Sequence, residues 1–265
     1  MPTFSSFDKE NKVVTQEYDF SDKQSKGTFL TKVFGMMFLC LLITTVVAAG
    51  FGYGFQYLLV KTATNDGGNL VFNQDLVMGL IIGLIITIIA LLIMSFVLPI
   101  TFMRGKHNIL VPLIIYVVLM GIMLSTFTFL VEPIILVESF GITSAIFGVM
   151  ALLGYLSKGK LAGIGVILLG LLIGAGLLAL INFLMILIGG ISQTSVTLSW
   201  IISFLIFGFL MLMTMWDVAR INAIAAKGCE SGNNLVYYCA YILYSDFIAI
   251  LIRVIYYMAI IFRKR

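Results

Sequence analysis

Residues 214–248 read TMWDVARINAIAAKGCESGNNLVYYCAYILYSDFI, two apolar stretches separated by a short polar turn. Each stretch carries one aspartate, Asp217 in the first and Asp246 in the second, equidistant from the middle of the turn between Ser231 and Gly232. If both stretches are helices that fold back as a hairpin, both aspartates lie about 15 Å from the turn, at roughly 1.5 Å per residue. The spacing predicts that the two carboxyl groups meet at one level.

The composition indicates an all-α polytopic membrane protein. Apolar residues make up 61% of the chain and charged residues 11%, whereas a soluble domain carries roughly 25% charge. Seven apolar runs reach the length of about 17–25 residues that a transmembrane helix needs. Because these runs are continuous and do not alternate, they do not resemble barrel strands. We expect the spans near residues 29–57, 76–100, 109–131, 142–157, 161–188, 198–226 and 235–262.

The domain organisation follows from these spans. Residues 1–28 are polar and of mixed charge, which predicts a short N-terminal arm, and residues 29–265 form one seven-helix transmembrane domain. The connections on the side of the arm are basic, whereas Lys61 is the one basic residue in the connections on the other side, so the N-terminus is expected in the cytoplasm. The compact loops and the lack of sorting signals favour a bacterial plasma membrane.

The basic tail, residues 263–265, departs from this charge pattern. Seven crossings would place the tail outside, against the preference of Lys and Arg for the cytoplasmic side. The last segment therefore either crosses fully or enters the membrane and returns, and we favour the full crossing.

Several classes of site are not indicated. Three unpaired cysteines and a single histidine, His107, do not assemble a zinc site. No glycine loop with a phosphate-binding lysine occurs, which argues against a nucleotide-driven pump. The small positive net charge is explained by topology, so nucleic acid is not an expected partner, and no cofactor is expected.

The charged residues inside the spans are the candidates for function: Asp217, Arg220, Asp246 and Arg253. A lone carboxylate near the middle of the bilayer costs on the order of 3 kcal/mol. One interpretation is neutralisation within each helix, because Asp217 and Arg220 are three residues apart and share a helix face. Arg253 lies two turns from Asp246 and would have to reach back.

The other interpretation is that Asp217 and Asp246 face each other and share one proton. Two carboxylates in contact cannot both ionise cheaply in a poorly solvated site, so they titrate as a unit. Such a pair responds to pH. Once deprotonated, it offers oxygens suited to a transient metal contact with a hard cation such as Ca²⁺.

Short motifs resemble the transmembrane Bax inhibitor motif family. The stretches WDVARI at 216–221 and YSDFI at 244–248 resemble the last two helices of that family. Further similar stretches are VESFGIT at 137–143, which contains Glu138, and the pair at 103–104. The resemblance covers about residues 29–262. Trp216 stands where a tyrosine is usual.

The resemblance implies six helices around a central C-terminal helix and a pH-sensitive Ca²⁺ leak across the membrane. It assigns proton sensing to Asp217 and Asp246. It assigns to Arg104 a latch that binds the pair and closes the pore from the cytoplasmic side. The charges expected to support the pair are Arg220, Arg253 and Glu138. The implied partners are Ca²⁺, protons and lipid; the oligomeric state stays open, and a monomer is compatible.

Three functional hypotheses stay open. The leading one is a proton-gated leak channel, in which loss of the shared proton brings repulsion or capture of a carboxylate by Arg104. The second is an intramembrane aspartyl protease, although the chain reads Leu243-Tyr244-Ser245-Asp246 where those enzymes have Gly-x-Gly-Asp. The third is a non-conducting protein that regulates partners. The sequence does not separate a leak from a proton-coupled exchanger.

Overall fold

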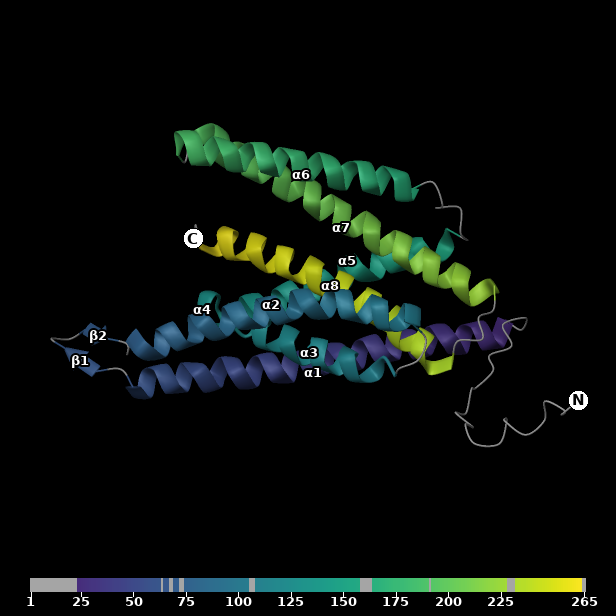
Figure 1. Ribbon diagram of the computed structural model, residues 1–265, viewed down its shortest axis with the longest axis horizontal. Coiled ribbons are helices and arrows are strands. Elements are labelled where there is room, and N and C mark those ends of the chain that lie inside the picture. The colour runs from purple at the N-terminus through teal and green to yellow at the C-terminus, as the bar shows by residue number, and fades with distance from the viewer. Residues whose placement is uncertain are drawn as a thin grey trace, which may run out of the picture.

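The computed structural model describes residues 23–62, 64–66, 69–71, 74–104, 108–157, 164–190, 192–227 and 232–263. Figure 1 shows elongated helices that run along the longest axis of the molecule. A short antiparallel hairpin of β1 (Thr64–Asp66) and β2 (Asn69–Val71) connects the first two helices. The helices are α1 (Lys23–Thr62), α2 (Gln74–Arg104), α3 (Leu110–Leu124), α4 (Phe127–Leu130), α5 (Pro133–Leu156), α6 (Ile164–Gly189), α7 (Gln193–Lys227) and α8 (Gly232–Arg263).

The prediction of seven transmembrane helices is confirmed. Seven helical segments within the described residues are long and apolar enough to cross a membrane, and α3 and α4 together form the third. Ser125 and Thr126 interrupt that span, and each hydroxyl donates to a carbonyl of the preceding turn. Such side-chain bonds compete with the helical ladder and bend it.

The fourth span begins at Pro133 rather than at residue 142. Glu138 and the polar residues after it make this stretch read as a loop in the sequence. In the structure Pro133 occupies the first turn of α5, where its fixed φ suits a helix and its missing N–H costs nothing. Ser139 and Thr143 are then fully buried on the inner face of α5.

Residues 1–22 of the predicted arm and residues 264–265 of the tail lie outside the described residues. The first helix, α1, begins at Lys23, inside the segment 1–28 that was expected to form the arm. The last helix, α8, is one unbroken helix of 32 residues. The start of α1 and the end of α8 lie at opposite ends of the bundle (Figure 1). The continuous α8 agrees with a full crossing and not with a segment that enters and returns.

Helix α8 packs against α1, α2, α3, α5 and α7. One contact of its core face is the Tyr244 hydroxyl, fully buried and 2.6 Å from Oγ1 of Thr44 on α1. Helix α6 packs along α7 and lies apart from α8 in Figure 1. The expected ring of six helices around the last one is therefore not confirmed, because α6 joins the molecule mainly through α7.

Candidate functional site

The position of α7 is fixed by a close approach to α5. A Cβ at Gly154 would collide with the carbonyl oxygen of Met215 and would lie 3.0 Å from Cβ of Val218. One turn further, the Asn222 side-chain amide donates to the carbonyl oxygen of Tyr155 at 3.1 Å. These contacts set the register of α7 on α5 on either side of Asp217.

Asp217 lies on this part of α7 and is only 4% exposed. A side-chain hydrogen bond joins it to Asp246 on α8. The structure thus brings together the two carboxyl groups that the spacing of residues 214–248 predicts to meet. Because ionised carboxylates only accept hydrogen bonds, a bond between two of them requires a proton on one.

The two carboxyl groups differ in how many of their oxygens have hydrogen-bond partners. Oδ2 of Asp246 is buried and has no hydrogen-bond partner among the described residues. A buried polar atom without a partner loses its hydration and gains nothing in return. This oxygen is therefore the atom of the pair that is available to a cation or to an incoming N–H donor.

Positive charge approaches the pair from α7 itself. Arg220 is exposed, interacts electrostatically with Asp217, and has its guanidinium 5.5 Å from the centre of the Trp216 ring. This stacking is a cation–π contact that holds the guanidinium beside the pair. Neutralisation of Asp217 by Arg220 alone does not describe the site, because the Asp217 carboxyl group bonds to Asp246.

The end of α2 reaches the edge of the site. The Phe102 ring stacks on the Tyr238 ring of α8, with centroids 4.1 Å apart and planes 4° from parallel. Tyr238 in turn interacts electrostatically with Asp217 and Arg220. Arg104 follows Phe102 as the last residue of α2; its side chain lies outside the described ones, so its role as a latch stays a prediction.

Sequence reasoning missed Phe102 and Tyr238 as parts of this site. Tyr238 near the start of a span is typical of an interfacial anchor. Tyr238 precedes Asp246 by eight residues, and positions i and i+8 share a helix face. This spacing could have placed Tyr238 near the aspartate pair.

The remaining predicted site residues lie elsewhere. Glu138 is exposed within the first two turns of α5. Arg253 is half-buried two turns beyond Asp246, where its Nη1 donates to Oγ of Ser203 at 3.5 Å. Of the three supporting charges expected, the structure places Arg220 beside the pair.

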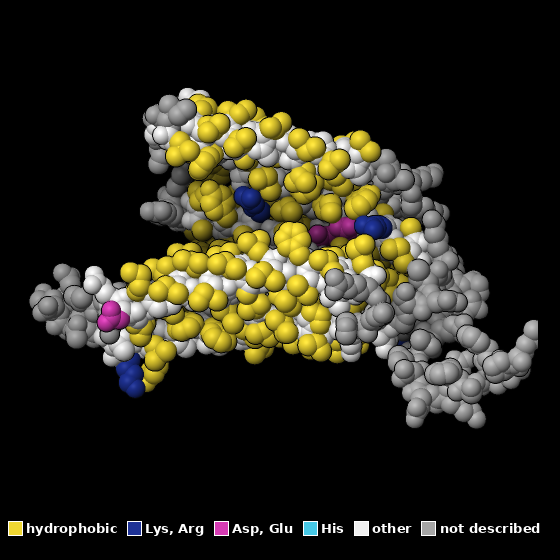
Figure 2. All heavy atoms as spheres, in the orientation of Figure 1, with side chains coloured by type: hydrophobic (Ala, Val, Ile, Leu, Met, Phe, Trp, Pro, Cys, Tyr) yellow, Lys and Arg dark blue, Asp and Glu magenta, His cyan; other side chains and the backbone are white. Residues whose placement is uncertain are grey.

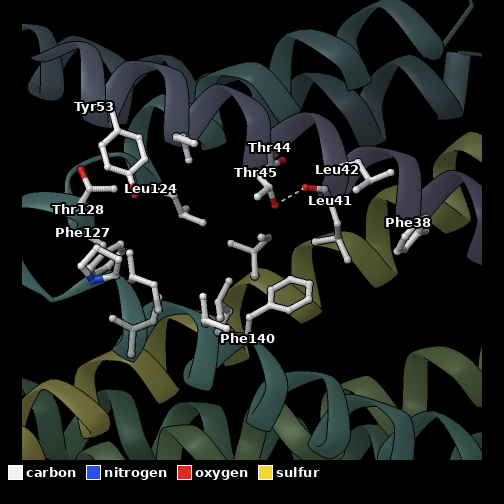
Figure 3. A pocket seen from close by; sticks show the side chains of 18 residues that line it. Phe38, Leu41, Leu42, Thr44, Thr45, Tyr53, Leu124, Phe127, Thr128 and Phe140 are labelled. Atoms are coloured by element: carbon white, nitrogen blue, oxygen red, sulfur yellow. Dashed lines mark hydrogen bonds between the residues drawn. The ribbon is translucent and has the colours of Figure 1, made fainter.

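A cavity of about 580 Å³ lies between α1, α4, α5 and α8 (Figure 3). Its α8 wall includes Ile248 and Leu251, and its other walls are mostly apolar. The hydroxyls of Thr44 and Thr45 each donate to a carbonyl one turn earlier on α1. Since Asp246 is not among its lining residues, this apolar cavity is separate from the aspartate pair.

Seven apolar helices, two of them joined by a hydrogen bond between acids of which Asp217 is buried, define a multi-pass integral membrane protein. Residues 26–264 match the family model described as inhibitor of apoptosis-promoting Bax1. The match covers almost the whole chain, so the chain belongs to this Bax inhibitor-like transmembrane family, as its motifs predict. No curated protein matches the chain.

Proposed function

We propose that this protein is a pH-sensitive Ca²⁺ leak channel gated by Asp217 and Asp246. The observation that carries the proposal is the side-chain hydrogen bond between the two acids, each on a different transmembrane helix. Because that bond exists only with a proton on one carboxyl group, proton loss changes the interaction between α7 and α8 directly. Membership of the Bax inhibitor-like family supports the assignment.

Proton loss leaves two negative charges in contact in a poorly hydrated site, where like charges repel strongly. A cationic side chain that reaches the pair would relieve the repulsion. Arg104 is the candidate, because Phe102 anchors the end of α2 against Tyr238 beside the pair. In this mechanism the latch closes the cytoplasmic side when the pair is deprotonated, so Ca²⁺ flux falls as pH rises.

The permeant ion meets the pair only briefly. Ca²⁺ takes six to eight oxygen ligands, and in the open state, where one carboxyl group of the pair keeps its proton, the pair supplies at most the two oxygens of one carboxylate and weaker carboxyl oxygens. A partial ligand set of this kind suits conduction, which requires an ion to leave as readily as it enters. The proposed function needs no cofactor and no catalytic residue.

We assign the N-terminus to the cytoplasm and the protein to a bacterial plasma membrane. The assignment is supported by the basic residues on one side of the spans and by compact connections. It places the α7–α8 turn, the Arg104 end of α2 and the aspartate pair toward the cytoplasmic side.

The test is Ca²⁺ flux into dye-loaded vesicles that contain the full-length protein, measured across about pH 5 to 9, where a shared proton is gained and lost. Wild-type flux is expected to be larger at low pH. Asp217→Asn and Asp246→Asn should each remove the pH dependence, since an amide cannot release the proton. Arg104→Gln should keep the flux high at high pH. Glu132→Gln is the matched control, because Glu132 is exposed at the start of α5 and distant in sequence from the pair.

Unchanged pH-dependent flux in both aspartate variants would remove the gating mechanism. Flux that rises with pH would assign opening to repulsion and would remove the Arg104 latch. A flux that follows an imposed proton gradient would identify an exchanger in place of a leak. Cleavage of a membrane peptide, blocked by an aspartyl transition-state analogue, would support the protease hypothesis instead.

A further inference from the structure

Arg253 lies in a second site, separate from the aspartate pair. It borders a groove of about 320 Å³ between α6, α7 and α8, together with Asn182, Ser199 and Ser203. Figure 2 shows a hollow between the α6–α7 layer and the layer below it, with charged side chains inside and apolar side chains along its rims. The site thus draws on three transmembrane helices.

The guanidinium of Arg253 is poorly satisfied. It has five N–H donors, and the structure gives it one hydrogen bond with the described residues, to Oγ of Ser203 at 3.5 Å. That distance is longer than the usual range of about 2.7–3.2 Å. A half-buried cation inside the membrane with four or more free donors is an incomplete arrangement unless a further group binds it.

Some of the polar groups beside Arg253 also lack hydrogen-bond partners. Asn182 is 8% exposed and donates to Oγ of Ser199 at 2.8 Å, while its Oδ1 is buried without a partner. Ser199 donates its own proton to the carbonyl oxygen of Ser195 at 2.8 Å, so it accepts from the Asn182 amide, and the second N–H of that amide is left for a ligand. Ser203 shares a 2.9 Å hydrogen bond with the Tyr257 hydroxyl. Its position is thereby fixed beside Arg253.

The charges that line the groove favour an anionic ligand. Its described lining holds one arginine, an amide and hydroxyls, and no acidic residue. The nearest acid along α8 is Asp246, which lies two turns from Arg253 and is hydrogen-bonded to Asp217. A planar guanidinium with adjacent hydroxyl and amide donors suits the oxygens of a phosphate group.

The depth of Arg253 identifies the source of that anion. Helix α8 has 32 residues and is thus about 48 Å long, against a hydrocarbon layer of about 30 Å. Arg253 lies ten residues before the end of α8, which puts its Cα about 6 Å inside the layer if the helix is centred. An extended arginine side chain spans that depth and reaches the headgroups.

We propose that Arg253, Ser203 and Asn182 form a binding site for the phosphate group of an anionic phospholipid whose acyl chains lie along the apolar rims of the groove. A zwitterionic lipid would bring an ammonium group next to Arg253 with no acid to receive it. The bound phosphate would contact α6, α7 and α8 at once. It would add a link between α6 and α8, which do not pack extensively against each other.

The test is native mass spectrometry of the full-length protein in detergent, titrated with phosphatidylglycerol or phosphatidylcholine. Both lipids offer Arg253 the same phosphate, but the choline ammonium of phosphatidylcholine is repelled by the guanidinium, so wild type is expected to retain phosphatidylglycerol about tenfold better. Arg253→Gln should abolish this preference, and Arg253→Lys, which keeps the charge but loses the planar fork, should reduce it to about threefold. Lys61→Gln is the control, because it removes a positive charge from the end of α1, at the same end of the bundle (Figure 1).

Three results would overturn the proposal. The first is equal retention of both lipids by wild type. The second is an undiminished preference in Arg253→Gln. The third is binding of inorganic phosphate without lipid that competes with phosphatidylglycerol and depends on Arg253, because the ligand would then come from water. Circular dichroism of each variant identifies a folding defect. Arg253→Lys retains the cation, so it tests the site even if Arg253→Gln fails to fold.

Discussion

Asp217 and Asp246 are the same residue type in two different situations. Asp217 lies between two contacts that fix α7 against α5. Asp246 has one buried oxygen without a hydrogen-bond partner among the described residues. At the scale of single residues the site is therefore asymmetric. The free oxygen of Asp246 is the point at which a cation or a guanidinium can enter.

The close approach of Gly154 to Met215 gives a prediction at this scale. Gly154→Ala should lower the free energy of unfolding by about 1–3 kcal/mol, because the added methyl group meets backbone that cannot rotate away. Thermal unfolding in detergent, followed by tryptophan fluorescence, measures the effect.

Gly148→Ala on the same helix is the matched control, because a Cβ there meets nothing within 4 Å. Its melting temperature should equal or slightly exceed that of wild type, since alanine favours helix more than glycine does. Equal losses in the two variants would contradict the role of Gly154 as a close-contact position.

At the scale of helices, α7 and α8 are held from different directions. The first is fixed to α5 through Gly154 and Asn222, and the second to α1 through the Tyr244–Thr44 hydrogen bond. The pair of acids joins these two halves. The end of α2 contacts the same junction through the stacked rings of Phe102 and Tyr238.

Removing that stack should weaken the coupling of α2 to the pair. Phe102→Ala loses a contact between stacked rings of about 0.5–1.5 kcal/mol beyond its buried area. The ratio of Ca²⁺ flux at low and high pH should then approach one, because in the proposed mechanism the end of α2 would no longer bring Arg104 to the carboxyl groups. The vesicle assay measures this ratio.

Phe96→Ala offers the comparison, since Phe96 is on the same helix and is 68% exposed. It should keep the wild-type ratio. A Phe102→Ala protein with the wild-type ratio would show that α2 does not transmit the state of the pair.

At the scale of the molecule, an odd number of crossings puts the basic tail against the charge rule. Seven spans and an unbroken α8 place the start of α1 and the end of α8 at opposite ends of the bundle. The packing of α8 along five other helices favours a full crossing of the last segment, although this crossing goes against the preference of Lys and Arg for the cytoplasmic side.

Epitope tags at the two ends test this topology. In right-side-out vesicles, protease should remove a C-terminal tag and leave an N-terminal tag intact until the membrane is opened. Removal of both tags, or of neither, from intact vesicles would mean an even number of crossings. A tag on the turn at 228–231 should behave like the N-terminal one.

Much of the aspartate site was predictable from the sequence because the relevant information is local along the chain. Equal residue counts from the middle of the turn predict a common level for Asp217 and Asp246 whenever both segments are helical. The parts supplied by other helices, Phe102 and Gly154, were not predictable from spacing. They become neighbours only when α2 packs against α8 and α5 against α7.

The sequence by itself determined the class of protein, the number of spans and the common level of the two acids. Each depends on run length, charge and residue count, which need no knowledge of neighbours. Only the tertiary structure decided that α6 lies apart from α8, that α5 begins at Pro133, and that Arg253 borders a groove of its own. These helices are apolar around most of their circumference, so the sequence pattern marks no inward face. Which side chains meet is decided by close packing between distant segments.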